Sequence, residues 1–140
     1  MTPEYIINTL NMNPHPEGGW YSETWRGSEQ PRPSGTAIYF LLEAHQSSHW
    51  HRVDAVEIWH WYAGGVLQLY VANERETQVT LLGQDLLSAQ YPQVIVPENA
   101  WQKAVPLDSW VLVGCTVSPG FEFDRFELAP KNWSPESVSQ

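Results

Sequence analysis

The sequence predicts an all-β domain preceded by one short helix. From about residue 36 onward, short runs rich in β-branched and aromatic residues follow one another, and turn residues interrupt them about every ten positions. Many short strands at that spacing are typical of a β-sandwich or a β-barrel. No second long helical pattern alternates with these runs, so a parallel α/β sheet is not expected. A chain of 140 residues has the size of one domain and can bury a core without disulfides.

The N-terminal residues carry the signals of a short helix. Thr2 is a good N-cap, Pro3 suits the first helical position and Glu4 favours the positive end of the helix dipole. Three apolar residues then recur at helical spacing, namely Ile6, Ile7 and Leu10. The helix should end by residues 13–14, and the two glycines of segment 15–19 indicate a turn.

Nine runs are predicted to be strands, and together they define one domain. We place this domain at residues 1–130 and expect residues 131–140 to be a polar C-terminal tail. The predicted strands are 20–25, 36–42, 49–53, 57–62, 66–71, 78–82, 93–96, 101–105 and 110–117.

Composition and charge exclude several classes of function. The net charge is −9, and seven lysines and arginines do not form the stripe of cations that a nucleic-acid polymer requires. No run approaches the ~20 apolar residues that span a bilayer. The first residues lack the features of a signal peptide, so we expect a cytoplasmic protein without a membrane partner. The single cysteine, Cys115, lies in an apolar run and is expected to be a small buried hydrophobe.

Tryptophan is unusually frequent, with eight in 140 residues. Tryptophan favours pleated, half-buried surfaces, so core and interface packing is the favoured interpretation and ligand stacking is the alternative. Five of the tryptophans lie in strand-like runs: Trp50, Trp59, Trp61, Trp101 and Trp110.

The stretch from residue 48 to residue 64 holds the residues that point to chemistry. His49 and His51 are two apart, so they would share one face of a strand. Glu57 begins the next run, and its alternation puts Trp59 and Trp61 on the same face as the carboxylate. If the turn brings the two strands together, two imidazoles and a carboxylate converge. Such a set suits Fe(II) and other divalent metals, and it equally suits a metal-free acid–base pair.

The other three histidines carry weaker signals. His60 has the opposite parity to Glu57 and is expected to be structural. His15 and His45 lie in loop-like segments and indicate little by themselves.

These residues resemble the motifs of the cupin superfamily. The first motif is matched by His49-x-His51, Glu57 and Gly64, with one or two extra residues between His51 and Glu57. Residues 97–102 resemble the second motif, a proline turn followed by a third inward histidine. Five segments in order resemble, more narrowly, the small single-domain family called cupin-5: 15–19, 36–42, 51–54 with 57–59, 96–97 with 101–102, and 117–123.

The resemblance implies a jelly-roll β-barrel, also called a double-stranded β-helix, whose interior is open to a ligand. It also implies a homodimer. Gln102 stands where metal-binding cupins have their third histidine, and an amide oxygen is a weaker ligand for transition metals than imidazole. A metal-free pocket is therefore favoured slightly. If a divalent metal is bound, the resemblance implies the ligands His49, His51, Glu57 and Gln102.

The favoured activity is that of a nucleotide-sugar epimerase or isomerase, which the family resembles in fold. Metal-free cupins of that type use a histidine base and a tyrosine acid. The corresponding residues here are the base His51 or His49, its partner Glu57 or Asp54, and the acid Tyr39 or Tyr62.

A nucleotide sugar, or a similar phosphorylated small molecule, would also need binding residues. Arg52 or Arg26 could pair with a phosphate, and Trp59 and Trp61 could cover a sugar ring or a base. Gln102 and Phe121 complete the predicted ligand contacts. The alternatives are a metal-dependent cupin of the dioxygenase or decarboxylase type, and a cupin that binds a ligand without turnover.

Overall fold

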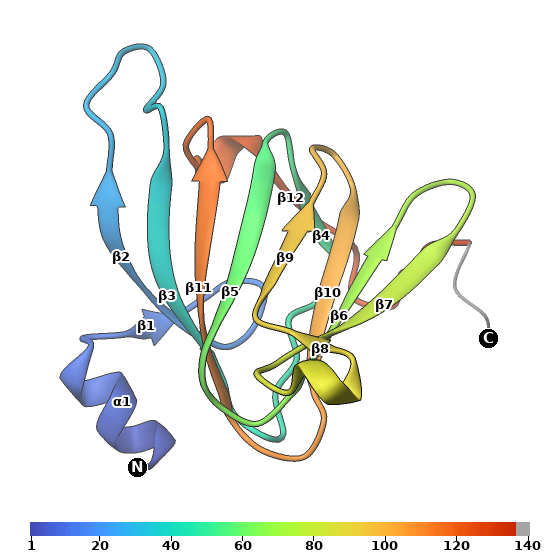
Figure 1. Ribbon diagram of the computed structural model, residues 1–140. Coiled ribbons are helices and arrows are strands. Elements are labelled where there is room, and N and C mark those ends of the chain that lie inside the picture. The colour runs from blue at the N-terminus through green and yellow to red at the C-terminus, as the bar shows by residue number, and fades with distance from the viewer. Residues whose placement is uncertain (137–140) are drawn as a thin grey trace.

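One α-helix and twelve strands make up the computed structural model, which describes residues 1–136 (Figure 1). The helix α1 is Pro3–Thr9, and two 3₁₀ turns are η1 (Leu86–Ser88) and η2 (Phe123–Arg125). The strands are β1 (Asn13–Pro14), β2 (Trp20–Arg26), β3 (Thr36–Leu42), β4 (His51–Val53), β5 (Val56–Gly64), β6 (Leu67–Ala72), β7 (Thr77–Leu82), β8 (Gln90–Tyr91), β9 (Gln93–Val96), β10 (Trp101–Pro106), β11 (Val111–Ser118) and β12 (Phe126–Leu128).

The strands form two six-stranded sheets. The first sheet has the order β1-β2-β3-β11-β5-β9 and the second has the order β12-β4-β10-β6-β7-β8. From β8 to β12 each strand lies in the opposite sheet from the one before it, so the chain winds between the sheets. This winding is the predicted jelly-roll, and the fold class is confirmed.

The helix covers the outer face of the first sheet. Its N-cap is Thr2, whose hydroxyl accepts a hydrogen bond from the backbone N–H of Tyr5 at 3.2 Å, as the sequence predicts. Ile6 is buried against Leu41 of β3 and Leu112 of β11. No helix within residues 1–136 is long and apolar enough to cross a membrane.

Every predicted strand is present, with ends that shift by at most two residues. The difference from the prediction that matters most for the candidate site is at β4. This strand begins at His51, whereas the predicted strand begins at His49. The backbone N–H of His49 donates to the carbonyl of Glu17 at 2.7 Å, so this residue belongs to a loop contact. Three short strands, β1, β8 and β12, were not predicted because two or three residues are too few to show a period.

The main core lies between the two sheets. Trp59 of β5 is 1% exposed and packs edge-to-face on Phe40 of β3, with ring centroids 5.8 Å apart. Trp50 is buried in a separate cluster with Ala72. The main core comprises Phe40, Leu42, Trp59, Leu67, Leu69, Leu82, Val96, Ala104, Val111, Val113 and Cys115.

The C-terminal segment contacts the second sheet. The ring of Trp133 lies 4.5 Å from the ring of Trp101 in β10, measured between centroids. Residues 137–140, the last part of the predicted tail, lie outside the described residues. The predicted domain boundary between residues 130 and 131 stays a prediction.

Candidate functional site

A small, mostly buried cavity lies between the sheets, and two of the predicted acid–base residues, His51 and Glu57, line it. Its volume is about 30 Å³, which is room for about one or two water molecules. Strands of both sheets and the segment 121–126 form its walls. The lining residues are His15, Glu17, Tyr21, Glu23, Thr36, Ile38, His51, Val53, Glu57, Cys115, Val117, Phe121, Phe123 and Phe126.

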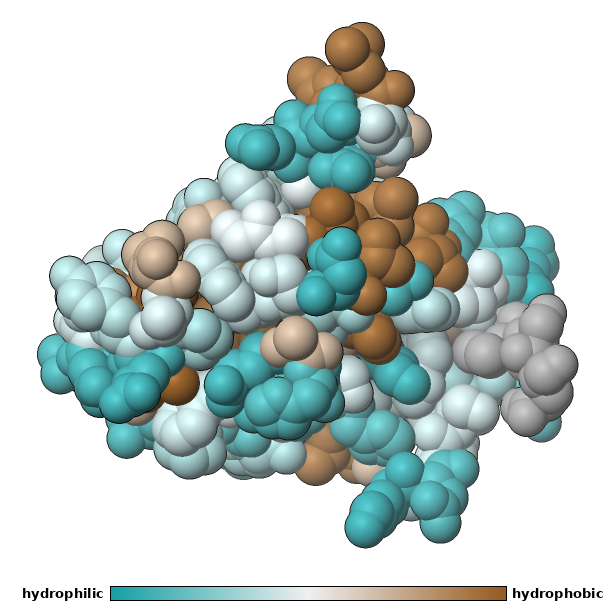
Figure 2. Space-filling view, turned by 90° about the horizontal axis from the view of Figure 1, so that it is seen from below, coloured by the Kyte–Doolittle hydropathy of each residue, from teal (hydrophilic) through white to brown (hydrophobic). Residues whose placement is uncertain are grey.

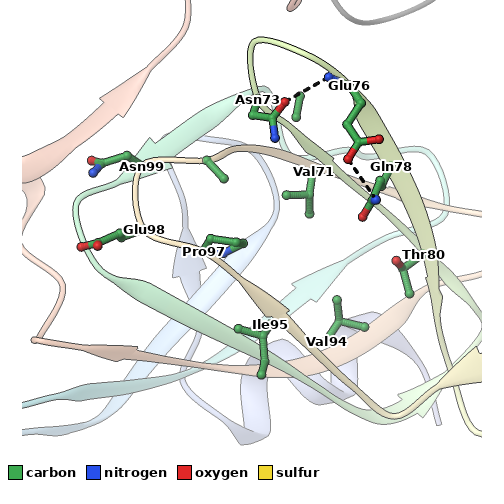
Figure 3. A pocket seen from close by; sticks show the side chains of 12 residues that line it. Val71, Asn73, Glu76, Gln78, Thr80, Val94, Ile95, Pro97, Glu98 and Asn99 are labelled. Carbon is green, nitrogen blue, oxygen red and sulfur yellow. Dashed lines mark hydrogen bonds between the residues drawn. The ribbon is translucent and has the colours of Figure 1, made fainter.

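A larger groove of about 350 Å³ lies elsewhere, between β6 and β7 on one side and β9 on the other (Figure 3). Figure 3 shows Val94, Ile95 and Thr80 along it, with Glu76 hydrogen-bonded to Gln78. None of the residues that line this groove is a histidine, a cysteine or a tyrosine. We therefore place the candidate site in the smaller cavity, where the titratable groups meet.

His51 enters the cavity from β4. Its ring is 2% exposed, and β4 is held between β10 and β12 by the pairs His51–Gln102 and His51–Leu128. Nδ1 lies 2.8 Å from the carbonyl oxygen of His49 and 2.8 Å from Oε2 of Glu17. Nδ1 is therefore engaged, and Nε2 is the ring nitrogen that remains for a ligand.

Glu57 enters the cavity from β5, where it is 7% exposed. Its Oε1 accepts a hydrogen bond of 2.9 Å from the side-chain amide of Gln102. The amide oxygen of Gln102 in turn accepts a hydrogen bond of 2.8 Å from the indole of Trp59. Because the indole can only donate, this chain of bonds sets the orientation of the amide and directs its NH₂ group toward Glu57.

Glu17 reaches the cavity from the turn between β1 and β2. Gly18 and Gly19 have φ angles of +108° and +82°, which are favourable for glycine alone among the common residues. A Cβ atom at Gly18 would meet the carbonyl oxygen of Ser47 at 2.4 Å, so the turn packs closely on its neighbour. This turn places the Glu17 carboxylate between His15 and His51, with Oε1 3.3 Å from Nδ1 of His15.

Burial and neighbouring charges set the protonation of the cavity. Burial by itself would lower the pKa of His51, but the charges of Glu17 and Glu57 outweigh it and raise that pKa to about 9. Burial raises the pKa of Glu57 to about 7, although the charge of His51 opposes this shift. Burial also lowers the pKa of His15. Near neutral pH, His51 is therefore protonated, Glu57 divides between two forms and His15 is neutral.

Aromatic rings close the cavity on the side of the segment 121–126. The ring of His15 lies 4.7 Å from Tyr21 and 5.9 Å from Phe123, and the ring of Phe126 lies 5.5 Å from His51, all between centroids. Phe123 is 49% exposed, whereas Phe121 is half-buried. These rings separate His51 and Glu57 from solvent.

The structure brings three of the predicted site residues to the cavity: His51, Glu57 and Phe121. Gln102 and Trp59 lie behind Glu57 and act on it through hydrogen bonds.

His49 does not join them. Its Nε2 lies 2.8 Å from the carbonyl oxygen of Pro130, and the residue precedes β4, so the alternation expected of a strand does not apply to it. The predicted partners of His51 also differ. Asp54 is paired with Arg32 at 2.8 Å, and the carboxylate next to Nδ1 of His51 belongs to Glu17.

The predicted tyrosines face away from the cavity. Tyr39 and Tyr62 lie on the outer face of the first sheet, with ring centroids 6.0 Å apart, and Tyr39 packs against the helix cluster. Neighbouring residues of β3 alternate, so Ile38 and Phe40 take the inner face. Trp61 is also engaged elsewhere, because its indole donates to the carbonyl of Gly65 at 2.8 Å.

The two predicted arginines have different positions. Arg52 lies on the outer face of the second sheet, where it pairs with Glu127 at 2.8 Å and stacks over Trp101 at 4.5 Å. Arg26 lies at the rim of the cavity, where it pairs with Glu23 and donates to the carbonyl of Phe121 at 2.9 Å. Of these two arginines, only Arg26 is near the aromatic rings of the segment 121–126.

Sequence reasoning missed five titratable residues of the lining: His15, Glu17, Tyr21, Glu23 and Cys115. The first two were visible within the segment 15–19, where an imidazole and a carboxylate precede two glycines. That segment was assigned to a turn, and the role of its side chains was not recognised. The Cys115 thiol was correctly expected to be buried, and burial with the charges of Glu57 and Glu17 raises its pKa, so it stays protonated.

The fold and cavity define a jelly-roll protein with a buried cluster of titratable side chains. The chain belongs to the cupin-5 family (DUF985) of the cupin superfamily, whose family model matches residues 4–129. The predicted resemblance is confirmed. No curated protein matches the sequence.

Solved structures share the fold. A protein from Shewanella oneidensis is 37% identical, with a TM-score of 0.88 over 92% of this chain and 85% of that one. A hypothetical protein from Leishmania major is 31% identical, with a TM-score of 0.87 over 92% of this chain and 88% of that one. Oxalate decarboxylase from Bacillus subtilis is 12% identical, with a TM-score of 0.66 over 83% of this chain and 29% of that one. The last likeness concerns the fold alone.

The residues present do not fit the metal centre that the superfamily implies. His49 points to Pro130, and the amide of Gln102 is committed to Glu57 and Trp59. Nδ1 of His51 is also engaged. Among the residues that the structure describes, no group of three or more His, Cys, Asp or Glu side chains has the arrangement of a metal site.

Proposed function

We propose that this protein is a metal-independent enzyme that moves a proton within a small carbonyl-bearing substrate, as epimerases and isomerases do. The observation that carries this proposal is that His51 and Glu57 line the same mostly buried cavity. Their environments leave one of them a cation and the other a poised carboxyl group near neutral pH. Two titratable groups with such different tendencies supply the acid and the base of a proton transfer.

The proposed step uses both groups. The carboxylate of Glu57 takes a proton from the carbon next to the carbonyl group, and the C–H electron pair moves onto the carbonyl oxygen as an enolate. The imidazolium of His51 donates to that oxygen through Nε2 and stabilises the charge. This assigns His51 the role of acid, whereas the sequence suggested a base.

The return of the proton decides the product. If Glu57 returns a proton to the same face of the same carbon, the substrate only exchanges a hydrogen with water. Isomerisation requires Glu57 to protonate the former carbonyl carbon, while His51 gives its proton to the former carbonyl oxygen and takes one from a hydroxyl on the first carbon. Tyr21 is the phenol that lines the cavity, in place of the predicted Tyr39, and delivery of a proton from Tyr21 to the opposite face would invert the carbon. Water then removes the proton from Glu57 and returns one to the Tyr21 phenolate. None of these routes requires an oxidant, because a proton leaves and a proton returns.

A nucleotide sugar remains the proposed substrate class. The cavity would hold part of the sugar. Arg26 at the rim would bind a phosphate after its ion pair with Glu23 breaks. Arg52 cannot serve in the same complex, because it lies on the outer face of the second sheet.

Solvent-deuterium exchange tests the reaction. UDP- and dTDP-sugars that carry a keto group on the sugar ring and raise the melting temperature would be incubated in D₂O. Deuterium in the sugar would be measured by mass spectrometry. His51→Gln should lower the exchange rate about a hundredfold or more, while the control His60→Gln, on the outer face, should retain it. The wild-type rate should be highest between about pH 7 and about pH 9.

The opposite results are equally informative. Exchange at the wild-type rate in His51→Gln contradicts the mechanism, and tight binding without exchange in the wild type identifies a binder without turnover. A metal-dependent cupin would instead purify with about one divalent ion per chain, measured by elemental analysis without a metal-binding tag.

A homodimer in the cytoplasm also remains part of this proposal. Figure 2 shows apolar residues gathered on the face seen from below, and an exposed apolar patch of this kind often marks a protein interface. Light scattering would show a particle of twice the chain mass. The large exposed apolar side chains from β7 to β9 are Val79, Leu86, Leu87, Tyr91 and Ile95.

A further inference from the structure

We propose that Oε2 of Glu17 accepts a hydrogen bond from a hydroxyl group of the ligand, so that the cavity recognises an uncharged, hydroxyl-bearing group. This inference rests on the proposed function for the general class of ligand. It adds the residue that recognises the part of the ligand inside the cavity.

The first observation is a buried acceptor with room for a second donor. The Glu17 side chain is 8% exposed, and its Oε2 lies 2.8 Å from Nδ1 of His51 in an ion pair. That nitrogen is shared with the carbonyl of His49, also at 2.8 Å, and among the described residues no other donor reaches Oε2. An ionised carboxylate oxygen can accept two hydrogen bonds, so the cavity has a place for one more donor.

The second observation is the charge around this acceptor. Glu17, Glu23 and Glu57 all line the cavity, so a phosphate inside it would face carboxylates. An ammonium group would compete with the imidazole of His51, which already pairs with Glu17. A hydroxyl group donates to Oε2 without adding a charge, and it can accept from a neighbouring donor at the same time.

The third observation is size. A cavity of about 30 Å³ holds one or two hydroxyl- or carbonyl-sized groups of a ligand and not a whole sugar ring or phosphate. The remainder of a sugar would lie against the rings of Tyr21, Phe121 and Phe123, which offer apolar faces at the outer part of the site.

A binding cycle tests this assignment. Isothermal titration calorimetry would compare UDP-glucose and dTDP-glucose with UDP and dTDP, which lack the glucosyl group. In the wild type, each nucleotide sugar should bind at least about tenfold more tightly than its nucleotide. In Glu17→Gln, which replaces the charged acceptor with an amide, this advantage should fall about tenfold or more. Glu127→Gln, on the outer face of β12, is the matched control and should preserve it.

A second variant keeps the test valid if Glu17→Gln does not fold. Glu17→Asp keeps the charge beside His51 but withdraws the acceptor by one methylene group, so it should also reduce the advantage of the sugar. The melting temperature of each variant would be recorded first. An equal advantage in wild type and both variants overturns the assignment, as does a wild type in which neither nucleotide sugar binds more tightly than its nucleotide.

The two proposals fail in different ways. If the sugar advantage depends on Glu17 but no deuterium enters any of the nucleotide keto sugars, the proposed reaction is wrong and the recognition stands. If deuterium enters the sugar while binding is independent of Glu17, the recognition is wrong and the reaction stands.

Discussion

At the scale of single residues, the site depends on a chain of hydrogen bonds that runs from Trp59 through Gln102 to Glu57. By the sequence resemblance, Gln102 stands where metal-binding cupins have their third histidine. Here it joins the indole of Trp59 to the carboxylate of Glu57. Gln102 thus positions the carboxyl group of Glu57 and partly offsets the rise in its pKa that burial causes.

Replacement of Gln102 with Leu should destabilise the protein. The change leaves the buried indole N–H of Trp59 without its acceptor and Oε1 of Glu57 without its amide donor. Each unsatisfied buried group costs about 1–3 kcal/mol, so the free energy of unfolding in urea should fall by at least about 2 kcal/mol.

Gln93→Leu provides the control, because Gln93 is an exposed residue of β9. Its free energy of unfolding should stay within about 0.5 kcal/mol of the wild type. A Gln102→Leu protein as stable as the control would show that these hydrogen bonds do not support the site.

At the scale of elements, the segment 121–126 is the part of the cavity wall that is best able to move. Its centre is the single 3₁₀ turn η2, and Phe123 within it is 49% exposed. By contrast, β11 is paired along its length with both β3 and β5. Side chains hold the segment in place, since Arg26 donates to the carbonyl of Phe121 and Arg32 donates to the carbonyl of Gly120.

Amide hydrogen exchange should therefore differ sharply between these two elements. We expect the amide of Arg125, which donates within η2, to exchange at least about a hundredfold faster than that of Val113 in β11. Mass spectrometry of peptic peptides, or NMR, would measure both. Equal protection of the two elements would mean that access to the cavity requires opening of the barrel itself.

The three strands that sequence patterns missed have a common physical cause. β12 pairs with β4 over only Phe126–Leu128, and β1 and β8 are shorter still. Strands of this length are formed because a neighbouring strand edge is available. Their own sequences carry too few residues to show alternation.

At the scale of the whole molecule, the buried pair links stability to pH. Both folded-state pKa values lie above their ordinary values, at about 9 for His51 and about 7 for Glu57. The folded protein therefore binds protons that the unfolded chain has already released. The stability that His51 contributes is complete below pH 6.5 and is lost as the pH rises toward 9.

The free energy of unfolding of the wild type should fall between pH 7 and pH 9, measured by urea denaturation at three or more values. His15 and His60 have lowered pKa values and act in the opposite direction, but only below their ordinary value of 6.5. His51→Gln should show a flatter curve in the same window. A wild type whose stability rises from pH 7 to pH 9 would contradict the charge state assigned to the cavity.

The sequence by itself determined the all-β class, the N-terminal helix with its cap at Thr2, and two central residues of the site, His51 and Glu57. These follow from local patterns, because capping and strand alternation act over a few residues. The family resemblance also followed from the order of short motifs along the chain.

Only the tertiary structure decided which carboxylate accompanies His51. Glu17 and His51 are 34 positions apart in the sequence. Their side chains meet because the turn at Gly18 and Gly19 places Glu17 next to β4. The structure likewise turned His49 toward Pro130 and Tyr39 toward the outer face of the sheet. Contacts between distant segments depend on how the sheets close around the interior, and the alternation of a single strand carries no information about that closure.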